Sequence, residues 1–98
     1  MSAPEEILPD TARPALLSGV RVKHDRVRGT WVLLAPERAL KLDPVGHAIL
    51  SEVDGERPFA EIVETLAARY DAPRARIAGD ARAYLVSLIE RRMAEARP

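Results

Sequence analysis

Residues 31–44, WVLLAPERALKLDP, contain the predicted change from strand to helix. The first four of these residues are apolar on both faces, which is typical of a central strand. A break at PER follows, and in ALKL, residues 39–42, the two leucines fall on one face of a short third strand. The closing DP predicts a helix start. An aspartate N-cap accepts hydrogen bonds from backbone N–H groups, and a proline at the first helical position lacks only an N–H group that would have no partner within the helix.

Strand signals precede this stretch and helix signals follow it. Residues 20–23, VRVK, alternate apolar and basic, which predicts a half-buried first strand. Three helices are expected after Asp43: one that ends before Gly55, one with an apolar stripe from Phe59 to Tyr70, and a long last one. The order of three strands and then three helices indicates an α+β domain with a three-stranded antiparallel sheet.

Length and composition limit the class of protein. The chain has 98 residues, 15 basic against 15 acidic side chains, no cysteine and a pI near 6.7. One domain is expected at this length, and the balanced charge argues against a role dominated by phosphate binding. No apolar stretch is long enough to span a membrane, no signal-peptide core follows the first residue, and the absence of cysteine fits a reducing cytoplasm.

The ends of the chain are predicted to lie outside the folded domain. Residues 1–19 carry prolines at positions 4, 9 and 14 and a net negative charge, so we expect a flexible tail or linker there. The domain is expected to span residues 20–94, which leaves residues 95–98 as a C-terminal end.

Catalytic and metal chemistry have little support in the sequence. His24 and His47 are separated by 23 positions, and neither lies in a recognisable catalytic or metal-ligand spacing. The five glycines are scattered singly, so no phosphate-binding loop is present. We therefore predict no catalytic residue, no metal site and no cofactor, and we expect that the protein is not an enzyme.

The residues alone leave two binding functions open, DNA binding and peptide binding. A DNA-binding winged helix also combines three helices with a small sheet, but the clusters of arginine here are partly neutralised and the strands precede the helices. The third strand, residues 39–42, carries only Lys41 as a charge and offers its free edge to an added peptide strand. The alternative is that this edge is short or covered by the N-terminal tail, and periodicity alone favours that alternative.

A set of short motifs is more specific than any one of them. They are GVRV at 19–22, WVLLAPERALKL at 31–42, AIL at 48–50, DGERPF at 54–59, EIV at 61–63, and Asp80 followed by Tyr84, Leu85 and Leu88. Together they resemble the pyrroloquinoline quinone biosynthesis protein D (PqqD) family. The resemblance implies a winged helix-turn-helix-like domain that binds the precursor peptide of pyrroloquinoline quinone. It also implies that the protein presents this peptide to a radical S-adenosylmethionine enzyme, as an adaptor that some relatives carry fused to another pathway enzyme.

The resemblance also indicates where the peptide would bind, between the third strand and the last helix. The docking edge is then predicted at Ala39, Leu40, Lys41, Leu42 and Asp43, and the facing wall at Tyr84, Leu85, Leu88, Ile89 and Arg92. For Leu85 and Leu88 the competing interpretation is that they belong to the core.

Overall fold

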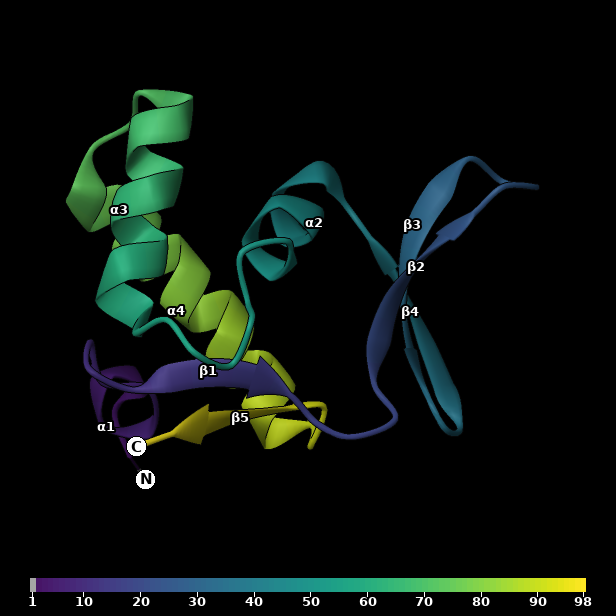
Figure 1. The fold of residues 1–98 in the computed structure, drawn as a ribbon, viewed down its shortest axis with the longest axis horizontal. Coiled ribbons are helices and arrows are strands. Elements are labelled where there is room, and N and C mark those ends of the chain that lie inside the picture. Colours follow the sequence, from purple (N-terminus) through teal and green to yellow (C-terminus); the bar gives the residue numbers. More distant parts are fainter. Residues whose placement is uncertain (1) are drawn as a thin grey trace.

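The structure is a computed structural model that describes residues 2–98. In chain order its elements are α1 (Pro4–Ile7), β1 (Arg13–Leu16), β2 (Arg21–Asp25), β3 (Thr30–Ala35), β4 (Arg38–Leu42), α2 (Pro44–Leu50), α3 (Phe59–Tyr70), α4 (Arg74–Glu90) and β5 (Ala94–Arg97). Strands β2, β3 and β4 form an antiparallel sheet in that order, and β1 pairs with β5 in a second sheet. Figure 1 shows the three-stranded sheet standing apart from α3 and α4, with α2 between them.

The α+β class and the three-stranded antiparallel sheet are confirmed. The prediction of three helices is wrong, because the described residues form four, and the second sheet was not predicted. The predicted start of α2 is confirmed: Pro44 is its first residue, and Asp43 Oδ1 accepts a hydrogen bond of 2.7 Å from the Gly46 N–H. The stripe on α3 is buried from Phe59 to Leu66, whereas Tyr70 is exposed.

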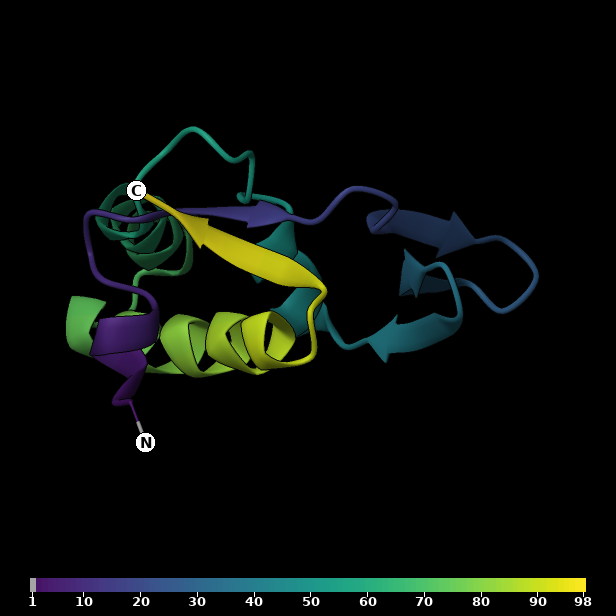
Figure 2. The same ribbon diagram turned by 90° about the horizontal axis from the view of Figure 1, so that it is seen from below.

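The segment predicted as a flexible tail is part of the folded core, which corrects the expected domain boundaries. Leu8 has no exposed surface, and β1 pairs antiparallel with β5 from Arg13 opposite Arg97 to Leu16 opposite Ala94. Figure 2 shows the two strands side by side. Residues 95–97 of the expected C-terminal end are therefore strand as well, and the domain begins before residue 20.

Long-range hydrogen bonds explain why this proline-bearing segment is ordered. The carbonyl oxygens of Asp10 and Ala12 accept hydrogen bonds from the N–H groups of Ala60 and Phe59, which open α3 and have no partner within the helix. On the other side, Arg82 of α4 donates to the Leu8 carbonyl at 2.9 Å and pairs with the Asp10 carboxylate. These partners lie far away in sequence, so local patterns give no sign of them.

A buried carboxylate joins the end of α2 to α3. Glu52 accepts hydrogen bonds from the guanidinium groups of Arg57 at 3.0 Å and Arg69 at 2.6 Å. Burial alone raises the pKa of Glu52, but the hydrogen bonds and positive charges of the two arginines outweigh it and bring the pKa below its ordinary value. The ionised form of Glu52 therefore stabilises the position of α2 against α3.

Truncation of Leu8 tests whether the N-terminal segment belongs to the core. Leu8→Ala should lower the free energy of unfolding by about 2–5 kcal/mol, because it removes a fully buried side chain and leaves a cavity. Val27→Ala is the control, since Val27 is 96% exposed and its truncation should change stability by less than about 0.5 kcal/mol. Urea unfolding of both variants measures the difference, and equal stabilities would contradict the assignment.

The pH dependence of stability tests the role of Glu52. Glu52→Gln should cost about 1–2 kcal/mol at pH 7, because it removes a carboxylate from two partly exposed guanidinium groups. A carboxyl whose folded pKa is lowered contributes stability above its unfolded pKa near 4.5 and loses it as the pH falls through the folded value. The gap between variant and wild type should therefore close in acid, whereas the exposed Glu56→Gln should show no gap at either pH. A gap that persists in acid would contradict this role.

Candidate functional site at the edge of β4 and along α4

The register of β4 is fixed by the turn that precedes it. Ala35 pairs with Arg38 across the two-residue turn at positions 36–37. A pair that closes such a turn exchanges both backbone hydrogen bonds, and along an antiparallel ladder these pairs alternate with pairs that exchange none. Every second residue from Arg38 onward therefore bonds to β3.

The remaining two residues of β4 direct their backbone groups outward. By this alternation, the N–H and C=O groups of Ala39 and Lys41 face away from β3, and within residues 2–98 no strand pairs with this edge. The N-terminal segment does not cover it, because that segment pairs with β5. The docking edge predicted over residues 39–43 is therefore open, and Ala39 and Lys41 hold its free donors and acceptors.

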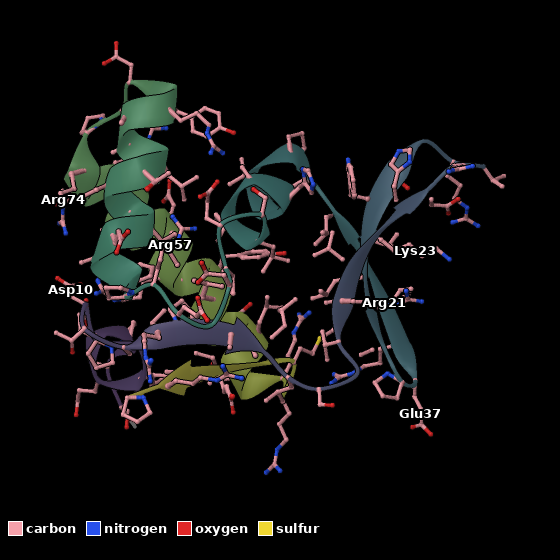
Figure 3. The ribbon with its side chains drawn as sticks, viewed as in Figure 1. Asp10, Arg21, Lys23, Glu37, Arg57 and Arg74 are labelled. Atoms are coloured by element: carbon pink, nitrogen blue, oxygen red, sulfur yellow. The ribbon has the colours of Figure 1, made fainter. Side chains whose placement is uncertain are left out.

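The side chains of β4 divide between two faces. Leu40 and Leu42 point to the core, and Leu42 is only 7% exposed. Ala39 and Lys41 lie on the outer face, which they share with Arg21 and Lys23 of β2. Figure 3 shows the side chains of Arg21 and Lys23 directed away from the helices. The outer face of the sheet is thus positively charged, and the inner face continues the core.

The C-terminal half of α4 runs beside β4 in the opposite direction. At the beginning of β4, Arg38 Nη2 donates to the carbonyl of Arg91 at 2.6 Å, just after α4 ends. At the end of β4, Lys41, Leu42, Asp43 and Tyr84 surround a hollow of about 210 Å³. The strand and the helix therefore approach each other at both ends of β4, and we call the surface between these two contacts the groove.

The predicted wall on α4 is only partly at the surface. Tyr84 and Ile89 are half-buried, whereas Leu85 and Leu88 are 0% and 1% exposed and belong to the core. Arg92 is exposed, but it follows the helix with a positive φ of 59° rather than lying on it. The core interpretation thus applies to Leu85 and Leu88.

Arg38 and Arg91 are members of the groove that sequence reasoning missed. Arg91 lies seven positions after Tyr84, a spacing that places both on one face of a helix, so periodicity contained a signal for it. Arg38 had no such signal, because its contact with the Arg91 carbonyl joins residues 53 positions apart.

Tyr84 packs closely on the first turn of α2. A Cβ atom at Gly46 would lie 2.8 Å from the Tyr84 hydroxyl oxygen, so only glycine fits there without a shift of the ring. Burial raises the pKa of Tyr84, the Asp43 carboxylate raises it further, and Arg91 opposes them. The phenol therefore stays protonated at neutral pH and has a proton to donate within the groove.

Residues 2–98 contain neither a candidate metal-ligand cluster nor a candidate membrane-spanning helix. No three His, Cys, Asp or Glu side chains there are grouped so as to hold a metal ion. Over the same residues, no helix is both long and apolar enough to cross a membrane.

The chain is similar to proteins of one family. The family model described as Coenzyme PQQ synthesis protein D (PqqD) matches residues 30–94. A protein of Xanthomonas oryzae named PqqA binding protein is 43% identical over 82 residues, which cover 84% of this chain and 89% of the relative. A protein of the same name from Xanthomonas axonopodis is 48% identical over 69 residues, which cover 70% of this chain and 75% of the relative.

Two solved structures are also similar. The solution structure of the PqqD truncation of Methylobacterium extorquens PqqCD, described as a functional, stand-alone recognition element for ribosomally synthesised and modified peptides, has a TM-score of 0.78. It is 38% identical, and the match covers 93% of this chain and 98% of that one. The crystal structure of PqqD from Xanthomonas campestris has a TM-score of 0.55 at 42% identity, with 80% and 87% of the two chains covered. On these similarities, which extend over most of its length, the chain belongs to the PqqD family.

Proposed function

We propose that the protein binds the precursor peptide of pyrroloquinoline quinone by strand addition at β4 and presents it to a radical S-adenosylmethionine enzyme. The relatives named PqqA binding protein support the choice of peptide, and the recognition-element description of the Methylobacterium extorquens protein supports the role. The observation that carries the proposal is the open edge at Ala39 and Lys41 beside the α4 groove.

Strand addition matches the chemistry of this edge. An extended peptide beside β4 meets two N–H donors and two C=O acceptors on Ala39 and Lys41, and pairing them adds one more strand to the sheet. Lys41 places a positive charge above the docked strand, where it favours an acidic side chain of the peptide by about 0.2–1 kcal/mol at this exposure.

The proposed role is that of an adaptor and assigns no bond-making step to this chain. Binding in an extended conformation orders the peptide. The edge of the peptide that faces away from β4 stays accessible, so a separate enzyme can reach it. We also propose that the fold is winged-helix-like and that the protein is cytoplasmic. The three-stranded sheet followed along the chain by α2, α3 and α4 supports the winged-helix part of this proposal.

Proline substitutions in β4 test the backbone mechanism. Lys41→Pro should weaken binding of the synthetic precursor peptide about 3- to 10-fold, because it removes one outward N–H donor worth about 0.5–1.5 kcal/mol while leaving the β3 ladder intact. Lys41→Ala keeps that donor and removes only the side-chain charge, so it should lose less affinity. Isothermal titration calorimetry on variants shown to be folded by circular dichroism measures both.

The register adds a second comparison to this test. Leu40→Pro removes a donor that β3 uses, so this variant should lose stability rather than only affinity. A folded Lys41→Pro variant with the affinity of wild type would refute strand addition at this edge, and a wild-type protein that fails to bind the peptide would refute the proposed function.

A further inference from the structure

An apolar hollow of about 310 Å³ lies between α2, α3 and α4. Its apolar lining includes Val45, Ala48, Tyr70 and Ile77, and Arg76 and Asp80 stand among the lining residues as its charged groups. Val45 is 61% exposed and Tyr70 is 55% exposed, so two large, exposed side chains lie together at this hollow. The core clusters do not fill this hollow, and apolar surface around it stays open to solvent.

The hollow lies near the end of β4, because its lining residues Pro44, Ala48 and Tyr70 also line a second hollow that reaches Lys41, Leu42 and Asp43. Among the residues that line the apolar hollow, Pro44 directly follows Asp43, and Ala81 lies one turn before Tyr84 on α4. A peptide that lies along β4 and runs past the end of that strand comes close to both hollows, and the one between α2, α3 and α4 has the more apolar lining.

The groove itself offers little room for selecting side chains. Hydrogen bonds from Ala39 and Lys41 are made to backbone and tolerate most sequences. Leu85 and Leu88, the apolar residues of the predicted wall, are already buried in the core. Discrimination between peptides therefore needs an unfilled apolar space near the edge, and the hollow beyond Asp43 is such a space.

We propose that the hollow receives a large apolar side chain of the same precursor peptide, a few residues beyond its strand-paired segment. This inference rests on the proposed function, since the edge of β4 brings the peptide to the hollow. An aliphatic or aromatic side chain contacts Val45, Ile77 and Tyr70 there, and Arg76 and Asp80 are placed to bind polar groups that flank it. The strand edge holds the backbone, and the hollow selects the sequence.

A charge placed at the mouth of the hollow tests this inference. Val45→Asp introduces a carboxylate at an exposed position in the first turn of α2, where the helix dipole favours it, so the fold should survive. Loss of the apolar contact should weaken binding of the synthetic precursor peptide about 10-fold. Val27→Asp is the matched control, because it adds the same charge at a 96% exposed position on the β2–β3 turn.

A double-mutant cycle identifies the side chain that enters the hollow. The apolar residues of the precursor peptide are replaced by Ala one at a time, and each peptide is titrated against wild type and Val45→Asp by calorimetry. One replacement should cost wild type about 10-fold and cost Val45→Asp much less, because the two changes remove the same contact. Ala48→Leu, which narrows the hollow without adding charge, should weaken the same peptides.

The outcomes separate this inference from the proposed function. Equal affinities of Val45→Asp and Val27→Asp, with Lys41→Pro still weakened, would overturn the hollow and keep strand addition. If sedimentation velocity shows that Val45→Asp abolishes self-association while peptide affinity is unchanged, a second copy of the chain occupies the hollow and the inference is wrong. Failure of wild type to bind the peptide would contradict the proposed function itself.

Discussion

The register of the β3–β4 hairpin determines which backbone groups the sheet leaves free. The turn at positions 36–37 makes Ala35 and Arg38 a hydrogen-bonded pair. Because such pairs alternate along an antiparallel ladder, this pair determines which residues of β4 bond to β3. A slip of one residue would direct Leu40 and its donor outward and turn its side chain from the core to solvent. The burial of Leu40 and Leu42 and the availability of Ala39 and Lys41 are thus two results of one constraint.

Asp43 lies between the last residue of β4 and the first residue of α2, so it connects the three-stranded sheet to the helices. Its carboxylate caps α2 at Gly46, and the missing side chain of Gly46 lets Tyr84 approach that first turn. Glu52, at the other end of α2, is bound by arginines that include Arg69 of α3. Helix α2 is therefore held at both ends by a carboxylate, and its position does not depend on a bound peptide.

Local sequence patterns predicted the parts of this fold whose partners are near in the chain. The period of two gave the strands from residue 20 to 42, the apolar stripe gave α3, and the DP pair gave the start of α2. The segment around Leu8 was taken for a linker because its prolines indicate extended chain. The groups that order it, Arg82 and the first N–H groups of α3, lie at least 47 positions away from the residues that they contact.

The elements of the candidate site could be predicted from the sequence, but not the burial of each residue. The weakly charged edge and the family motifs indicated β4 and α4, yet periodicity does not tell which members of an apolar stripe reach the surface. Leu85 and Leu88 were predicted in the wall, and the structure places them in the core. The contact between Arg38 and Arg91 and the hollow beyond Asp43 depend on how separate elements pack, which no local pattern contains.

Pairing of β1 with β5 has a consequence for attachment to other proteins. It brings both ends of the chain to one corner, where Arg13 also bonds to the carbonyl of Pro98, and Figure 1 shows that corner far from the three-stranded sheet. A protein that is covalently joined to either terminus therefore extends from the side of the molecule that lies away from the three-stranded sheet. Such a covalent link raises the local concentration of a bound peptide near the joined protein and leaves the edge of β4 unobstructed.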